Sequence, residues 1–302
     1  MHALRCSLCS NTDSQISNYL CDECNDLGRY EFFQHFLIKL QYNKNFHTFQ
    51  RICQTIYPAL VKFPFNFKPI QYFDPQVHQL DIISQQYVAL CEDTEGETKY
   101  FSNNEQQLIA LDVKGDGNCL YHCITLLGEM ANHYTVELRV QNIIELAMNA
   151  DAYLQFFKLY DTNLKAYIVR SMLYDRRWAE PWDLFGLCTV LNCNIRSVFP
   201  SLNTFTNIHP SAPPQKVMNK TFKPRQNIAT NTILIMWWRG ISPEDWILYS
   251  TEDIWAPNHY VPLIKPRVSL HLILLILIVN EYLLNLVLEY DIFDILYNES
   301  MF

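Results

Sequence analysis

The chain has 302 residues, of which 49% are hydrophobic and 18% are charged. This composition excludes global disorder, and the length suits one catalytic domain with attached segments. The formal net charge of −8 argues against a dedicated nucleic-acid binder, because affinity for polyanions comes largely from Lys and Arg.

The first segment, residues 1–30, contains two Cys-x-x-Cys pairs. Its cysteines are Cys6, Cys9, Cys21 and Cys24. Four thiolates at this spacing suit a closed tetrahedral site, so we predict a structural zinc knuckle here, with four unrelated buried cysteines as the alternative. The segment lacks the apolar run of a secretory signal, which indicates a cytoplasmic or nuclear protein.

The second segment, residues 31–104, is rich in aromatic side chains. It shows helical periodicity around Phe32, Phe36, Leu37 and Leu40. We interpret it as a helical adaptor, which a charged loop separates from a domain that spans residues 105–266.

This main domain begins with helical patterns and continues with strands. The apolar faces of two helices are predicted from Val136, Val140, Ile143, Ile144 and Ala147, and from Leu184, Leu187, Cys188 and Leu191. Three strands are predicted at residues 195–199, 233–238 and 259–264. Helices followed by strands favour an α+β fold in which a helical lobe packs on a mainly antiparallel sheet. Lys216, Lys220, Lys223 and Arg225, which could contact nucleic acid, are interpreted as a solvated basic loop.

The last segment, residues 267–302, has a different composition. A nearly continuous aliphatic stretch runs from Val268 to Val279. Its uncharged run is shorter than the roughly 20 residues that cross a bilayer, although tolerating Glu281 would extend it to about that length. A membrane anchor, a buried terminal helix and an appended transcript end remain open explanations, and a membrane partner is expected only in the first case.

The clearest candidate for chemistry is Cys119, which follows a glycine-containing turn. Gly115 and Gly117 lie within four residues of it, in a chain that has seven glycines. Such a turn can aim backbone amides at an oxyanion, and a helix start stabilises a thiolate. The turn fails as a calcium loop, because Lys114 stands at a ligand position and Cys123 replaces the final glutamate. It also lacks the patterns of phosphate-binding loops, so a purely structural cysteine remains the alternative.

Two stretches carry a resemblance to a known family. Asp116-Gly117-Asn118-Cys119-Leu120-Tyr121 resembles the nucleophile motif of the ovarian tumour (OTU) cysteine proteases, most of which are deubiquitinases. Asn258-His259-Tyr260-Val261-Pro262-Leu263 resembles the strand that carries their histidine. The order of the two stretches and the separation of 259 − 119 = 140 residues also suit this family. The resemblance spans residues 108–265.

The resemblance implies a papain-like OTU fold and an isopeptidase that cleaves ubiquitin or ubiquitin-like conjugates. It implies Cys119 as the nucleophile, His259 as the base, and Asp116 as the motif aspartate commonly counted among the catalytic residues. Gly117 and Asn118 belong to the turn that would bind the oxyanion. The resemblance implies no cofactor for catalysis, so the predicted zinc is structural.

One departure from the OTU pattern concerns the residue that orients the histidine. Many OTU enzymes carry Asn or Asp two residues after the histidine, where this chain has Val261. Asp253 and Asn258 are alternatives by proximity, although Asn258 is expected on the opposite face of the strand. The usual Arg and Ala after the motif aromatic are replaced by His122 and Cys123, for which we favour harmless packing.

A more detailed resemblance connects the chain with the vertnin-type branch of OTU-like domains, whose nucleophile motif is degraded. It is carried by residues 194–200, 222–225, 233–237 and 255–257. This chain keeps Cys119 and His259, so it resembles the vertnin type in its frame and an active protease at the two decisive positions. The alternative function is therefore a weak or inactive module that binds protein or nucleic acid in transcriptional regulation.

Overall fold

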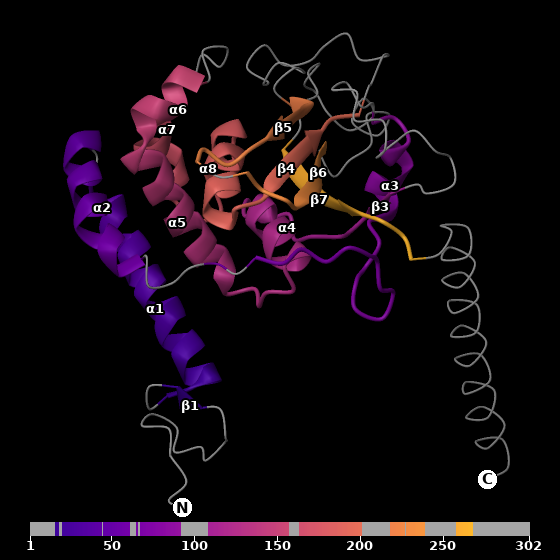
Figure 1. Ribbon diagram of the computed structural model, residues 1–302, viewed down its shortest axis with the longest axis horizontal. Helices are drawn as coiled ribbons and strands as arrows, with labels where there is room; N and C mark the ends of the chain where they lie inside the picture. The colour runs from indigo at the N-terminus through magenta and orange to yellow at the C-terminus, as the bar shows by residue number, and fades with distance from the viewer. Residues whose placement is uncertain are drawn as a thin grey trace, which may run out of the picture.

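A computed structural model describes residues 16–17, 20–43, 45–60, 65, 67–91, 108–156, 163–200, 218–226, 228–238 and 258–267. Most of the helices lie on one side of a five-stranded sheet (Figure 1). The chain therefore has the mixed α+β architecture that the order of helical and strand patterns predicts.

The main sheet consists of β3 (Ile109–Ala110), β4 (Asn194–Val198), β5 (Lys220–Phe222), β6 (Thr232–Trp238) and β7 (His259–Ile264). The spatial order is β3-β7-β6-β4-β5. The β4–β6 pair is parallel and the other three pairs are antiparallel, which confirms a mainly antiparallel sheet. The register places His259 of β7 opposite Trp238 of β6.

The helices are α1 (Asp22–Gln41), α2 (Phe46–Leu60), α3 (Ile82–Val88), α4 (Cys119–Leu127), α5 (Tyr134–Met148), α6 (Ala150–Phe156), α7 (Leu164–Tyr167), the π-helical turn η1 (Ile168–Met172) and α8 (Pro181–Leu191). The predicted apolar faces lie inward on α5 and α8, where all their members are buried except the half-buried Val136. Both helices therefore follow the period of 3.6 residues that their sequences carry.

Two adjoining apolar cores hold the helical lobe to the sheet. The first joins α4 and α8 to the strands, and the second joins α1 and α2 to α5, α7 and η1. Phe33, Phe36, Leu37 and Leu40 of α1 are buried in the second core. Segment 31–104 thus shares a core with the main domain. The division of the chain into four parts stays a prediction, although α1 continues across the expected boundary at residue 30.

The short helix α3 covers the other face of the sheet, opposite α1 and α5 (Figure 1). The ring of Tyr87 lies 4.1 Å from that of Trp238, and the Cys91 thiol lies 3.5 Å from the sulfur of Met236. Both partners belong to β6, so this central strand is covered on both faces, which explains its nearly continuous apolar sequence.

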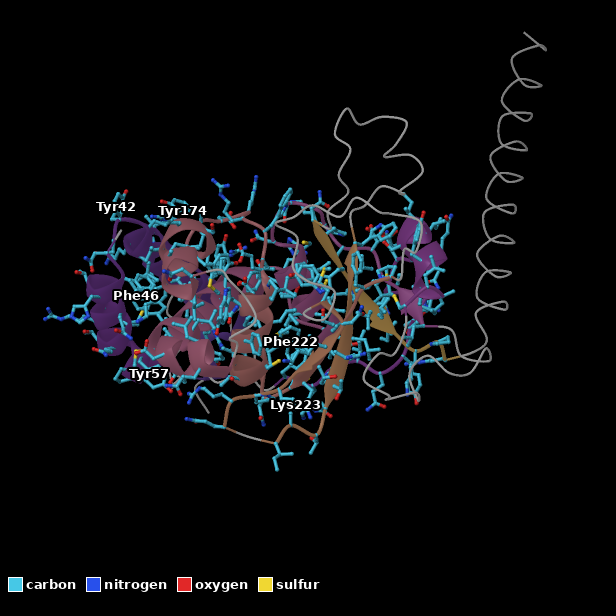
Figure 2. The ribbon with its side chains drawn as sticks, turned by 90° about the horizontal axis from the view of Figure 1, so that it is seen from above. Tyr42, Phe46, Tyr57, Tyr174, Phe222 and Lys223 are labelled. Carbon is cyan, nitrogen blue, oxygen red and sulfur yellow. The ribbon has the colours of Figure 1, made fainter. Side chains whose placement is uncertain are left out.

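The prediction of a solvated basic loop is wrong for the residues that the structure describes between 218 and 226. Residues 220–222 form the edge strand β5, in which Phe222 points inward and packs against Phe185 at 4.6 Å between ring centroids (Figure 2). Lys223 points outward, whereas Arg225 pairs with Glu145 of α5 at 3.2 Å. The burial of Thr221 and Phe222 in this short edge strand is not visible from the charges around it.

Both ends of the chain carry predictions outside the described residues. Cys6, Cys9 and the tail 267–302 beyond Arg267 lie there, as do the side chains of Cys21 at the end of β2 (Leu20–Cys21) and Cys24 in α1. A short hairpin joins β2 to β1 (Ile16–Ser17) just before α1. Within the described ranges, His, Cys, Asp and Glu form no group of three or more that could hold a metal ion. The zinc knuckle therefore stays a prediction.

In the part of the chain that the structure describes, no helix is both long enough and apolar enough to cross a bilayer.

Candidate active site

The nucleophile turn, residues 114–118, is shaped by one carboxylate and one glycine. Asp116 Oδ1 accepts a hydrogen bond from the Asn118 N–H at 3.0 Å, and Oδ2 lies 3.2 Å from Lys114 Nζ. Gly117 has a φ of +88°, and a Cβ there would lie 2.0 Å from the carbonyl oxygen of Arg176. Only glycine fits this position, because any side chain would suffer both backbone strain and a clash.

Asn118 links the nucleophile turn to a buried arginine. Its Nδ2 donates to Asp175 Oδ1 at 2.8 Å, and its Oδ1 accepts from Arg139 Nη2. The Arg139 guanidinium also donates to the carbonyls of Met172 and Arg177, at 3.2 and 3.0 Å. Arg139 is only 2% exposed, so protein acceptors compensate for the burial of this charge.

A second buried group supports the helix that follows the turn. Asp183 of α8 accepts hydrogen bonds from Tyr121 Oη at 2.6 Å, from Tyr167 Oη, and from the Glu180 N–H at 2.9 Å. Burial raises the pKa of Asp183, against the hydrogen bonds of the two tyrosines. The guanidinium of Arg139 stacks over the Tyr121 ring at 4.5 Å, which joins this network to the nucleophile turn.

Cys119 is the first residue of α4 and is 1% exposed. Burial raises the pKa of its thiol to about 11, although backbone hydrogen bonds from Tyr260 and Leu120 act in the opposite direction. One turn later, Cys123 donates from Sγ to the Tyr260 carbonyl at 3.3 Å. The two cysteines therefore fasten α4 to the residue that follows His259, and the thiol of Cys119 is protonated at neutral pH in this conformation.

His259 begins β7 and lies against the nucleophile turn. A Cβ at Gly115 would be 3.7 Å from His259 Cε1 and 3.8 Å from Nδ1, so the ring packs directly over this glycine. Burial lowers the pKa of His259 below its ordinary value, whereas the charges of Asp81 and Asp112 act to raise it. The imidazole is thus neutral at physiological pH, the state in which it can accept a proton.

A cavity of about 380 Å³ opens beside the histidine. Its lining, which defines the base cavity, consists of Asp81, Ile83, Asp112, Gly115, Trp178, Asn258 and His259. Trp178 is 58% exposed and Ile83 is 47% exposed, so two exposed apolar side chains stand beside two carboxylates in the lining of the cavity. An extended substrate segment fits such a surface better than a small buried ligand does.

The predicted site residues lie on α4, on β7 and in the nucleophile turn. Cys119 and His259 lie on adjoining elements, and Gly117 and Asn118 lie in the turn between them. Asp116 pairs with His122 at 3.1 Å and with Lys114, so its contacts shape the turn. Its assignment as a catalytic residue stays a prediction.

The alternatives for the orienting residue fare differently. Val261 is fully buried in the core. Asn258 lines the base cavity together with His259, although the sequence places it on the opposite strand face. Asp253 lies outside the described residues. The structure adds Asp81 and Asp112 to the cavity, and Arg139 beneath the turn; Asp81 and Arg139 are distant from Cys119 and His259 in the sequence, whereas Asp112 shortly precedes the nucleophile turn. Of these three residues, Asp81 has a local sequence signal. An aspartate three residues before Ser84 is typical of a carboxylate that caps a helix start.

Comparisons with known proteins identify the class. A family model described as "Vertnin, OTU domain" matches residues 110–176 and 160–238. Vertnin from Mus musculus is 22% identical over 167 residues, which cover 47% of this chain and 22% of that protein. Residues 110–238, less than half of the chain, therefore match an OTU domain. Within this class the domain is vertnin-like, and it matches about a fifth of the length of mouse vertnin.

Solved OTU structures are also similar to parts of the chain. The viral OTU domain protease from Dera Ghazi Khan virus is 18% identical, with a TM-score of 0.34 and coverage of 53% of this chain and 82% of the viral one. The OTUD1 OTU domain is 19% identical, with a TM-score of 0.34 and coverage of 60% and 98%. A complex of OTUB1 with ubiquitin aldehyde and UBCH5B~Ub is 13% identical, with a TM-score of 0.33 and coverage of 71% of this chain and 94% of that one.

Proposed function

We propose that the OTU domain is a cysteine isopeptidase that cleaves ubiquitin or ubiquitin-like conjugates. The observation that carries the proposal is the meeting of two elements: α4 begins with Cys119 behind a glycine turn, and β7 begins with His259 packed on Gly115 of the same turn. The substrate class follows from the OTU family, and the exposed rim of the base cavity supports an extended protein tail as the bound segment.

The reaction is an acyl transfer with balanced proton movements. His259 removes the thiol proton of Cys119, and the sulfur attacks the carbonyl carbon to form a C–S bond. The protonated imidazole then donates to the leaving lysine amine as the C–N bond breaks. Water, deprotonated by His259, hydrolyses the thioester and restores the thiol. Backbone N–H groups of the nucleophile turn would bind the oxyanion.

Burial of the thiol sets a condition on this reaction. A pKa of about 11 leaves little thiolate at neutral pH, so we infer that substrate binding opens the contact between Cys119 and the backbone of Tyr260. The sulfur would then turn toward the base cavity, where the neutral His259 can take its proton.

The test is covalent capture by ubiquitin that carries a C-terminal electrophile. We expect the full chain to gain the mass of the probe, Cys119→Ala to gain none, and His259→Ala to react far more slowly. Cys53→Ala, which changes a buried thiol of the helical lobe, is the matched control and should react like the wild type. A folded wild-type protein that forms no Cys119-dependent adduct would exclude the proposed activity toward ubiquitin.

One observation favours a second candidate, a binding module of OTU fold without catalysis. Val261 is buried and apolar at the orienting position, and the thiol of Cys119 is buried as well. In that case the base cavity and its rim would bind a protein tail without cleaving it. Binding of unmodified ubiquitin to the wild type and to Cys119→Ala with equal affinity, and without adduct formation, would support this candidate over the first.

A further inference from the structure

The orienting group for His259 is absent from its own strand. The residue two positions along β7 is Val261, which is fully buried in the apolar core and has no polar side-chain atom. A general base that is free to rotate loses much of its effect, because the ring must present one nitrogen to the thiol in the correct tautomer. A positioning group must therefore come from another element.

Two carboxylates from a neighbouring edge of the sheet line the same cavity as the histidine. Asp81 and Asp112 line the base cavity together with His259. Asp81 precedes α3, and Asp112 follows β3, the strand that pairs with β7. Of the titratable groups that act on the imidazole, these two are anionic, and His122 of α4 is the cationic one when it is protonated.

Backbone hydrogen bonds fix both carboxylates relative to β7. The Asp81 N–H donates to the Ala110 carbonyl and the Asp112 N–H donates to the Gln79 carbonyl, each at 2.9 Å. The Leu111 N–H donates to the Pro262 carbonyl at 3.0 Å, which ties this pair of segments to the strand of His259. The cavity wall opposite the imidazole is therefore part of the sheet edge rather than a loose loop.

The two carboxylates differ in how firmly their side chains are held. Asp81 caps α3: its Oδ1 accepts from the Ser84 N–H at 2.9 Å, and its Oδ2 accepts from Ser84 Oγ at 2.6 Å. It is half-buried, whereas Asp112 is exposed. A carboxylate fixed by two hydrogen bonds loses little entropy when it accepts a third from an imidazole, and each of its oxygens has a lone pair left for that bond.

We propose that Asp81 is the positioning residue for His259, and that Asp112 adds a second negative charge to the same cavity. Asp81 takes the part that Asn or Asp on the histidine strand takes elsewhere, and it stabilises the imidazolium that forms when Cys119 loses its proton. This inference rests on the proposed function for its catalytic meaning. The electrostatic effect of the Asp81 charge on the imidazole does not depend on it.

The experiment measures the pKa of His259 directly, by NMR titration of its Cε1–H signal, which is assigned by its loss in His259→Gln. Asp81→Asn keeps one capping oxygen for the Ser84 N–H while it removes the charge and the second acceptor oxygen, so the variant should fold. We expect its His259 pKa to fall below the wild-type value and Asp112→Asn to give a smaller decrease. Asp151→Asn, at an 81% exposed carboxylate of α6, is the control and should give no change.

The same variants are then reacted with the ubiquitin electrophile across a range of pH. Loss of the negative charge that stabilises the imidazolium should slow labelling of Asp81→Asn by about tenfold, and its acidic limb should move to lower pH because the base itself has a lower pKa. An unchanged His259 pKa in folded Asp81→Asn, or a decrease only in Asp112→Asn, would overturn the assignment of Asp81. Absence of labelling in the wild type together with a lowered pKa in Asp81→Asn would sink the isopeptidase and leave the carboxylate–imidazole interaction standing.

Discussion

The nucleophile turn and the base cavity adjoin each other, but they are held by different interactions. Beneath the turn, Arg139, Asn118 and Asp183 belong to a buried network that hydrogen-bonds with carbonyls, tyrosines and amides. Around His259, a glycine packs against the ring, and two carboxylates and an exposed tryptophan line the same open cavity. The groups that position the nucleophile thus also stabilise the fold, whereas the groups that position the base contribute less to the free energy of unfolding.

This difference teaches where mutations should separate stability from chemistry. A buried polar network fails as a unit, because each lost partner leaves another group unsatisfied in a low dielectric. Groups at a cavity rim fall back on water when a partner is removed. Substitutions beneath the turn should therefore unfold the protein and abolish labelling together, while those in the base cavity should change labelling alone.

The largest effect is expected from Gly117→Ala. The energetic cost of a positive φ adds to the cost of a clash with the Arg176 carbonyl. We therefore expect a loss of about 4 kcal/mol in the free energy of unfolding and no labelling by the ubiquitin probe. Chemical denaturation provides the measurement. Gly28→Ala in α1 is the control, because nothing lies within 4 Å of a Cβ there and the change should stabilise the helix slightly. Equal stability of the two variants would contradict the shape assigned to the turn.

The next effect is expected from Arg139→Met. The change keeps the apolar stem but leaves Asn118 Oδ1 and the carbonyls of Met172 and Arg177 without their donor, which should cost about 2 to 3 kcal/mol. The denaturation midpoint should fall accordingly, and labelling should fall with it. Arg170→Met, on the exposed side of η1, should leave both unchanged. A stable Arg139→Met protein with normal labelling would show that the turn does not depend on this network.

Asp116→Asn should give the smallest effect, and one that depends on pH. Burial would raise the pKa of Asp116, but hydrogen bonds from the Asn118 N–H, Lys114 and His122 prevail and lower it. Because the folded-state pKa is lowered, the ionised carboxylate stabilises the protein above its usual pKa of 3.8. This stabilisation is lost as the pH falls through the folded-state pKa. At pH 7 the variant should be less stable by about 1 kcal/mol. Denaturation between pH 7 and pH 3 should show this difference shrinking, and a constant difference would rule out the charge as its source.

Much of the fold could be predicted from the periodicity of the sequence. The buried faces of α5 and α8 and the strands β4, β6 and β7 all lie where their apolar patterns indicate, because local periodicity and burial agree there. The edge strand β5 was not predicted, because the lysines in and beside it indicated a solvated loop. The packing of α1 against α5 was also hidden, since it depends on contacts between residues about a hundred positions apart.

The site divides in the same way. The turn of Asp116, Gly117 and Cys119 has a local signature, because a positive φ needs glycine and an Asx-type turn needs aspartate. Asp81 and Asp112 could not be assigned, since their meeting with His259 depends on how β3 pairs with β7. Topology, rather than any motif, brings these carboxylates to the histidine.

The fit of Gly117 against the Arg176 carbonyl has a consequence for how such domains change over evolutionary time. Loss of Cys119 would remove one sulfur from a helix start and leave the side-chain hydrogen bonds of Asp116 and Asn118 intact. Loss of Gly117 would disturb the turn and the segment it touches. In a lineage that abandons catalysis, the cysteine can be replaced by another small buried residue, while selection for folding keeps the glycine. The glycine turn is therefore expected to persist wherever the fold persists, with or without the cysteine.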